Sequence, residues 1–319
     1  MRDAASKNPQ STAYHRKISQ AVSQATQILH DAGVGDERLT ANLLLCHLLN
    51  IDRTQLLIKS NEALEESDYQ AFLKLIERRA TGEPLQYITG HQEFYGLDFK
   101  VTPDVLIPRP ETEFLVEQII KLAKAHPSDE SSSRITHHAS LLNQEWLFAD
   151  IGTGSGCIAV TLAYCLKNAR VFAIDISEAA LQIARENAAH HQVASRIEFL
   201  EGDLFAPLAG RNLENSLDLI ASNPPYVPLK DLPTLQREVR DYEPHTALFA
   251  DENGLRFYRR LLEESPRYLK PGGFLVCEIG CAQYEPINQL LKNFSNWQLV
   301  NVINDLQGIP RTLTIRKMV

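Results

Sequence analysis

Apolar residues recur at helical spacing through the first quarter of the chain. Between Ile18 and about Ala80 they stand three or four positions apart, with breaks at residues 33–35 and 51–53. This pattern predicts a small bundle of several short helices. No strand-like alternation interrupts the pattern and no residues in it suggest chemistry, so we expect residues 1–81 to form a helical docking domain.

The texture of the sequence changes over residues 82–110. Short runs rich in Tyr, Phe and Val alternate there with Gly and Pro, which predicts a β-hairpin connector. A helix is expected from about Glu111 to Ala125. Residues 126–143 are rich in Ser and His and follow no period, so a surface loop is expected there.

After Asn143, strand-like and helix-like segments alternate, which is typical of a parallel sheet covered by helices on both faces. The clearest helices are expected at Glu178–His190 and Gly254–Leu269. The last two strand candidates are joined by a short polar link, so one edge of the sheet is expected to carry an antiparallel pair. The expected strands are Trp146–Ile151, Val171–Asp175, Ile197–Leu200, Leu217–Ser222, Phe274–Ile279, Gln298–Ile303 and Thr312–Arg316.

The length of 319 residues suits one large domain and a smaller one. The formal net charge of -8 argues against a broad surface for duplex nucleic acid, because such a surface needs clustered Lys and Arg. No apolar run could span a bilayer and the polar first residues lack the core of a secretory signal, so a frayed terminus and a cytoplasmic location are expected. Cys277 and Cys281 lack zinc-type spacing, so no metal is expected.

The segment Gly152-Thr153-Gly154-Ser155-Gly156 stands where the first strand of this sheet is expected to turn into a helix. Glycines let the backbone approach a ligand and adopt a positive φ, and the N–H groups at the helix start are then expected to face that ligand. The segment predicts a nucleotide-type cofactor. Its spacing also satisfies the looser glycine pattern of nicotinamide-binding folds, and a tight turn without a ligand would use the same residues.

Two acidic positions follow at the ends of the next strands. Asp175 ends the second strand, where a carboxylate can accept hydrogen bonds from both ribose hydroxyls of either cofactor. Asp203 and Leu204 follow the third strand. In an S-adenosylmethionine site Asp203 would face the adenine amino group and Leu204 would pack on the ring, although an acidic turn that closes a strand is an equal interpretation of Asp203.

The motif Asn223-Pro224-Pro225-Tyr226 comes directly after the fourth strand. It could be only a rigid proline turn. Its functional interpretation uses that rigidity, because the side-chain oxygen of Asn223 and the carbonyl of Pro224 can accept the N–H bonds of a planar amide or amine while Tyr226 covers its plane. Such a nitrogen needs positioning rather than a strong base. A hydride-transferring enzyme would need an acid or base that the sequence does not offer, so methyl transfer is favoured.

Together these residues resemble the HemK/PrmC family of release factor glutamine methyltransferases, over nearly the whole chain from the helical domain onward. The Asn-Pro-Pro-Tyr signature also occurs in methyltransferases that act on DNA adenine or RNA guanine, whereas the connector segments are more specific. The segments that carry the resemblance are Gly82–Ile88, Val105–Glu113, Gly152–Gly156, Asn223–Tyr226, Glu243–Pro244, Ala247–Phe249, Gly254–Leu255, Tyr258 and Glu278–Gly280.

The resemblance implies a class I methyltransferase of the α/β class, with a seven-stranded Rossmann-like sheet over residues 111–319. It implies that S-adenosylmethionine is held by Gly152–Gly156, Asp175, Asp203, Leu204 and Asn223, and that Ile107–Glu113 borders its methionine end. Asn223, Pro224, Pro225 and Tyr226 would receive the substrate, with Asn223, Pro224 and Tyr226 in catalytic roles.

The substrate implied by the resemblance is the glutamine of the Gly-Gly-Gln motif in class I peptide chain release factors, with the helical domain helping to dock them. No membrane or stable nucleic-acid partner is expected. The runner-up is an exocyclic-amine methyltransferase for RNA or DNA, which would require a basic surface and an aromatic platform for a flipped base. The glycine loop and Asp175 are also compatible with a nicotinamide oxidoreductase, and the fold alone with a non-catalytic binding module.

Overall fold

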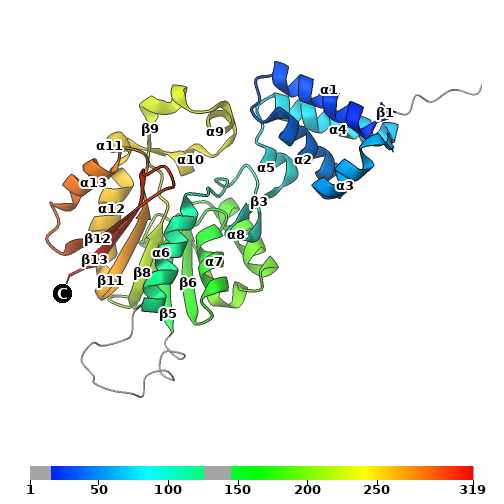
Figure 1. Ribbon diagram of the computed structural model, residues 1–319. Coiled ribbons are helices and arrows are strands. Elements are labelled where there is room, and N and C mark those ends of the chain that lie inside the picture. The colour runs from blue at the N-terminus through cyan, green and yellow to red at the C-terminus, as the bar shows by residue number, and fades with distance from the viewer. Residues whose placement is uncertain (1–15, 126–144, 319) are drawn as a thin grey trace, which may run out of the picture. The chain divides into compact units, whose positions relative to one another are not determined.

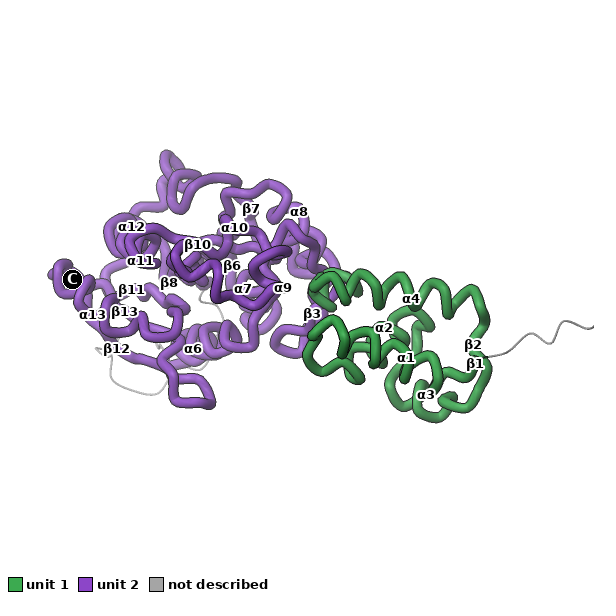
Figure 2. Tube along the Cα trace, turned by 90° about the horizontal axis from the view of Figure 1, so that it is seen from above, with its two compact units in different colours: residues 1–89 green, residues 90–319 purple. Residues whose placement is uncertain are grey.

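The computed structural model describes residues 16–125 and 145–318, so the frayed N-terminus and the loop expected at 126–143 lie outside the described residues. The chain divides into two compact units, Met1–Thr89 and Gly90–Val319, which Figure 2 draws in different colours. Each unit has its own hydrophobic core.

The first unit is the expected bundle of short helices. Helix α1 buries Ile18, Val22, Ala25 and Leu29, which recur with the spacing of one helical face and pack into the core of this unit. One expectation is wrong, because a short antiparallel pair of strands occurs within the bundle. Strands of two residues are too short to leave an alternating pattern in the sequence. The elements are β1 (Arg16–Lys17), α1 (Ile18–Asp31), α2 (Glu37–Leu49), α3 (Arg53–Ile58), β2 (Ala63–Leu64), α4 (Glu66–Ala80) and α5 (Leu85–Thr89).

The expected hairpin is present, but it occupies only part of the predicted connector. Residues Leu85–Thr89 form helix α5 of the first unit, and the hairpin of β3 (His91–Phe94) and β4 (Leu97–Lys100) belongs to the second. Asn187 ties the end of this hairpin to the body of the unit, because its side chain bonds both backbone groups of Lys100 and also donates to the Ser155 carbonyl at 2.9 Å.

The second unit is a seven-stranded sheet in the order β12-β13-β11-β8-β5-β6-β7 (Figure 1). The five strands from β11 to β7 are parallel, and β13 runs antiparallel to both of its neighbours, which confirms the expected antiparallel edge. One core cluster lies between the sheet and helices α6, α7 and α8, and the other lies between the sheet and helices α12 and α13. The strands are β5 (Trp146–Ile151), β6 (Ala169–Asp175), β7 (Ile197–Glu201), β8 (Leu217–Ser222), β11 (Leu269–Glu278), β12 (Trp297–Asn304) and β13 (Pro310–Lys317).

The helix expected at Gly254–Leu269 is shorter than predicted. Helix α12 spans Arg256–Glu264, because Gly254 adopts a φ of +87° before it and Pro266 lies just beyond its end, while Leu269 already begins β11. The remaining elements of this unit are α6 (Thr112–Ala125), α7 (Cys157–Cys165), α8 (Glu178–His190), β9 (Val227–Pro228), α9 (Arg237–Tyr242), α10 (His245–Leu248), β10 (Phe249–Ala250), α11 (Asp251–Gly254) and α13 (Tyr284–Leu291).

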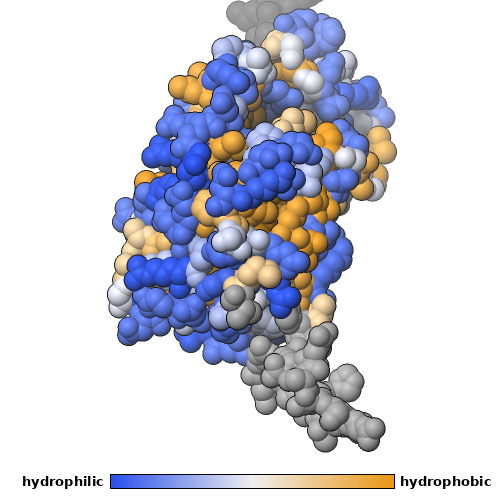
Figure 3. Space-filling view, turned by 90° about the vertical axis from the view of Figure 1, so that its left-hand side faces the viewer, coloured by the Kyte–Doolittle hydropathy of each residue, from blue (hydrophilic) through white to orange (hydrophobic). Residues whose placement is uncertain are grey.

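Hydrophilic side chains cover most of the face drawn in Figure 3, and apolar side chains gather toward its middle. Most large apolar side chains are buried; the described exceptions that are more than half exposed are Leu57, Ile58, Ile176, Leu229 and Leu306. No helix in residues 16–125 or 145–318 is both long and apolar enough to cross a membrane.

Candidate active site

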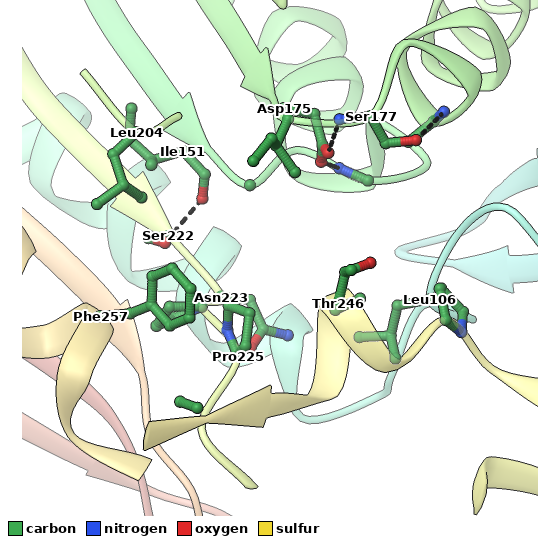
Figure 4. Close-up of a pocket in the computed structure, with 18 of the residues that line it drawn as sticks. Leu106, Ile151, Asp175, Ser177, Leu204, Ser222, Asn223, Pro225, Thr246 and Phe257 are labelled. Carbon is green, nitrogen blue, oxygen red and sulfur yellow. Dashed lines mark hydrogen bonds between the residues drawn. The ribbon is translucent and has the colours of Figure 1, made fainter. Parts of the chain in front are cut away.

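A cavity of about 430 Å³ opens at the carboxyl ends of the central strands in the second unit (Figure 4). Strands β5 and β8 are neighbours in the sheet, but the chain leaves them toward opposite sides. Loops that diverge at such a point leave a crevice where open α/β sheets bind their ligands. The Ser222 hydroxyl donates to the Ile151 carbonyl at 2.7 Å and holds the ends of these two strands together beneath the cavity.

The three glycines of the loop after β5 have two structural roles. Gly152 and Gly154 line the cavity with φ angles of +75° and +54°, and a Cβ on either would meet no other atom within 4 Å. They therefore leave space in the cavity wall. Gly156, also at positive φ, lets helices α7 and α8 approach, because a Cβ there would lie 3.0 Å from that of Ala184.

Three N–H groups of this loop form hydrogen bonds within the protein. Those of Gly152 and Thr153 donate to the Ile174 carbonyl at 2.8 and 2.9 Å, and that of Gly154 donates to Asp175 Oδ2 at 2.8 Å. The loop is thus fixed mainly by hydrogen bonds within the protein.

Asp175 connects the glycine loop to helix α8. Besides the bond from Gly154, its Oδ1 accepts from the Ser177 backbone N–H at 3.0 Å, and the Ser177 hydroxyl caps the helix by accepting from Ala180 N (Figure 4). Burial raises the pKa of Asp175, and the backbone hydrogen bonds oppose this shift. Because a carboxylate has about four acceptor positions, each oxygen still has capacity for a ligand hydroxyl.

Asp203 forms an ion pair that the sequence did not suggest. Both of its carboxylate oxygens accept from Arg260 Nη1, at 2.8 and 2.9 Å. Arg260 and Phe257 come from helix α12 and line the cavity, as does Leu204, which is buried with a φ of +48°. In the region predicted to flank an adenine, Leu204 and Phe257 therefore supply apolar surfaces. Asp203 and Arg260 supply an ion pair next to them.

Gln283 fixes the loop that follows β8 by a hydrogen bond to its backbone. The Gln283 side chain donates to the Tyr226 carbonyl at 2.8 Å and accepts from the Gly280 N–H at 2.9 Å. Gly254 approaches the same carbonyl so closely that a Cβ there would lie 2.2 Å from the oxygen. The rigidity of Asn223-Pro224-Pro225-Tyr226 thus comes from its surroundings as well as from its prolines.

Replacing Gly254 with alanine is expected to displace this loop and to destabilise the protein by about 1–3 kcal/mol, the usual effect of overpacking. The positive φ of Gly254 adds strain to the clash with the Tyr226 carbonyl. Urea unfolding measures the change in stability. Gly308, also at positive φ but with open space around its Cβ, gives the matched control, so an equal loss in both variants would show that the clash is unimportant.

Asn223 belongs to a buried chain of hydrogen bonds. Its Nδ2 lies 3.2 Å from Thr112 Oγ1, and the Thr112 hydroxyl donates to Glu278 Oε2 at 2.5 Å. The Tyr226 hydroxyl lies 3.4 Å from the other oxygen of Glu278. Thr112 and Glu278 are buried, and burial raises the pKa of Glu278 to about 7.

The segment before α6 is fixed against the loop that follows α9. Arg109 Nη2 donates to Glu243 Oε1 at 2.6 Å, and the Ile107 N–H donates to Glu243 Oε2 at 3.4 Å. Burial raises the pKa of Glu243, while the Arg109 guanidinium lowers it. The pair places Leu106 and Thr246 on one side of the cavity (Figure 4).

The structure brings most of the predicted site residues to this one cavity. Those that line it are Gly152, Gly154, Asp175, Asp203, Leu204, Asn223, Pro224 and Pro225. Thr153, Ser155, Gly156 and Tyr226 are absent from its lining and support it instead. The sequence analysis missed Phe257, Arg260 and Gln283 and gave no role to Glu278, and it expected Thr112 only as part of the Ile107–Glu113 segment that would border the methionine end of the cofactor.

The donor set and the shape of the cavity fit S-adenosylmethionine. A nucleoside needs an acceptor pair for its ribose hydroxyls and apolar surfaces for its base; Asp175 supplies the first, and Leu204 with Phe257 supplies the second. The two cavity glycines leave the space that their missing side chains would fill. Among the described residues, no cluster of three or more His, Cys, Asp or Glu side chains could hold a metal ion.

Sheet order and cavity define a class I methyltransferase that uses S-adenosylmethionine. A methyltransferase-domain family model matches residues 145–315, and a PrmC N-terminal domain model matches residues 20–90. The catalytic domain of hMettl16, solved in complex with the MAT2A 3'UTR hairpin 6, shares the fold with a TM-score of 0.51 at 17% identity, covering 78% of this chain and 81% of that one.

Curated relatives identify the family more narrowly. A release factor glutamine methyltransferase of Koribacter versatilis is 41% identical over 94% of this chain and 98% of its own length. One of Nitratidesulfovibrio vulgaris is 40% identical over 97% of this chain and 98% of its own length. The chain belongs to the release factor glutamine methyltransferase family, which confirms the resemblance seen in the sequence.

Proposed function

We propose that this protein transfers a methyl group from S-adenosylmethionine to the side-chain amide nitrogen of the glutamine in the Gly-Gly-Gln motif of class I peptide chain release factors. The observation that carries the proposal is the position of Asn223 and Pro224 in the wall of the cavity that Asp175 and the glycine loop also line. The names of the curated relatives support the choice of substrate.

The chain's own residues would act mainly by orienting the glutamine amide. The Asn223 side-chain oxygen and the Pro224 carbonyl accept its two N–H bonds, which leaves the nitrogen facing the cavity. Bound S-adenosylmethionine supplies a methyl group activated by a sulfonium. As the new bond between the nitrogen and this methyl group forms, the bond between the methyl carbon and the sulfonium sulfur would break and S-adenosylhomocysteine would be the leaving group. After the transfer, the nitrogen would release one proton to solvent.

A strong general base is unnecessary in this scheme. The ionisable residues that line the cavity are Asp104, Asp175, Asp203, Asp251, Arg256 and Arg260. Of these, Asp203 is paired with Arg260 and Asp251 with Arg256. Orientation and exclusion of water therefore carry the catalysis, for which about 7–11 kcal/mol is available in well-aligned systems.

We also propose the finer assignments that accompany this function. Residues 1–81 would dock the release factor, and residues 111–319 would catalyse the methyl transfer. Residues 82–110 would connect these two domains. Tyr226 would act indirectly, through its carbonyl and hydroxyl contacts beneath the substrate position. The protein would act in the cytoplasm, where translation terminates.

Mass spectrometry of a purified class I release factor after reaction tests the proposed function. We expect one added methyl group on the glutamine of its Gly-Gly-Gln loop, and none on a release factor in which that glutamine is replaced. Parallel reactions with tRNA, rRNA and DNA and labelled S-adenosylmethionine test the exocyclic-amine alternative. Label that enters nucleic acid and spares the release factor would overturn the proposal.

A further inference from the structure

We propose that Thr112 and Glu278 are positioning residues that fix the side-chain amide of Asn223 with its oxygen toward the substrate. The inference rests on the proposed function for its consequence in catalysis. It assigns a role to a buried carboxylate and a hydroxyl that lie outside the cavity lining.

The order of donors along the chain determines the orientation of the amide. Thr112 has one hydroxyl hydrogen, and at 2.5 Å it is donated to Glu278, which as a carboxylate can only accept. The oxygen of Thr112 can then only accept from its other neighbour. The Asn223 atom 3.2 Å away must therefore be the Nδ2 donor, so Oδ1 occupies the other branch of the amide.

A defined orientation matters because the two ends of a carboxamide have nearly the same shape and opposite polarity. Asn223 lines the cavity, so a rotation of half a turn about its last side-chain bond would present an NH₂ group to the substrate. Two N–H groups would then face each other, and the glutamine nitrogen would lose an acceptor. Prolines in the loop fix the backbone of Asn223 but have no influence on this rotation.

The ionised state of Glu278 is the one that enforces this order. If Glu278 were protonated, it could donate to Thr112, and the freed hydroxyl could then donate to Asn223. The ionisable groups that interact with the Glu278 side chain are Glu111 before α6, Arg311 on β13, Tyr226 after β8, Cys157 at the start of α7 and Tyr258 on α12, whose hydroxyl also donates to the Glu278 backbone carbonyl. Burial raises the pKa of Glu278 to about 7, and Arg311 opposes that shift. Glu278 therefore gains or loses its proton within a pH range in which the enzyme can be assayed.

Thr112→Val keeps the shape of the side chain and removes both hydrogen bonds. We expect kcat toward the release factor to fall by roughly 10–100-fold, the range for a buried polar group that loses its partner. S-adenosylmethionine affinity, measured by calorimetry, should stay within about twofold, since it does not depend on this orientation. Thr112→Ser, which retains the hydroxyl, should restore most of kcat.

Thr314→Val on β13 is the matched control. The Thr314 hydroxyl is buried and has no hydrogen-bond partner among the described residues, so its loss should leave kcat unchanged. Equal losses of kcat in both valine variants, or a failure of Thr112→Ser to recover, would assign Thr112 a packing role and overturn the proposal.

Glu278→Gln tests the charge. Wild-type kcat should rise as the pH increases through about 7, because the carboxylate is the form that orients Asn223. In Glu278→Gln this rise of kcat with pH should disappear. If kcat still rises through this pH in the variant, the rise belongs to another group and contradicts the role of Glu278. Asp150 is one such group, because burial raises its pKa to about 7 as well.

A measurement that needs no release factor separates this inference from the proposed function. The side-chain NH₂ signals of Asn223, identified by their loss in Asn223→Asp, should shift with pH through about 7 in the wild type and remain constant in Glu278→Gln and Thr112→Val. If the Asn223 signals of the wild type do not shift with pH, the positioning role of Thr112 and Glu278 is wrong, even if the release factor is methylated. The expected shift without methylation would instead refute only the substrate.

Discussion

Replacing Asn223 with alanine is expected to lower turnover by roughly 10²–10³-fold, the usual effect of removing one preorganised polar group from a transition state. The side chain lies in the cavity wall and is held by Thr112, so its oxygen is oriented before the substrate arrives. An alanine would remove that acceptor and leave a space that water can enter. The Pro224 carbonyl would remain, which is why activity should be reduced rather than abolished.

Single-turnover kinetics with a release factor, together with calorimetry of S-adenosylmethionine binding, checks this expectation. The cofactor affinity of Asn223→Ala should stay close to that of the wild type, because Asp175 and the glycine loop are unchanged. Asn301→Ala, at an exposed position on β12, is the control and should retain full turnover. Near-normal turnover in Asn223→Ala would exclude the role given to this residue.

The sheet was predictable because its strands are short buried runs between clear turn signals. Trp146–Ile151 and Leu217–Ser222 have the expected bounds. The start of β11 was missed because Leu269 follows the apolar spacing of the preceding helix, and only Pro266 indicates that this helix has ended. Strands β1 and β2 were missed because pairing of two residues depends on contacts distant in sequence.

Within the site, residues adjacent to strand ends were predictable, whereas residues that complete it from distant segments were not. Asp175 is the last residue of β6 and Asn223 directly follows β8, and the parallel topology brings both to one edge of the sheet. Arg260 reaches Asp203 across 57 positions of sequence, and Thr112 reaches Glu278 across 166. No local pattern encodes such pairs, because the two partners lie far apart in sequence.

Replacing Asp175 with alanine is expected to weaken S-adenosylmethionine binding by roughly 10–100-fold, the equivalent of about 1.5–3 kcal/mol for hydrogen bonds to a charged group. Two effects contribute to this loss. The ribose hydroxyls lose their acceptor, and the Gly154 and Ser177 N–H groups lose theirs, which loosens the loop that shapes the cavity. Turnover at saturating cofactor should change much less than in Asn223→Ala.

A double-mutant cycle separates the two effects. Calorimetry compares S-adenosylhomocysteine with its 2′-deoxy analogue on the wild type and on Asp175→Ala. If Asp175 binds the 2′-hydroxyl directly, the 2′-deoxy analogue should bind the wild type more weakly than S-adenosylhomocysteine does. On Asp175→Ala the two ligands should bind almost equally. An equal loss on both proteins would mean that Asp175 acts only through the loop. In that case the carboxylate would shape the cavity through Gly154 without touching the ribose, and the assignment of the nucleoside end would need another acceptor.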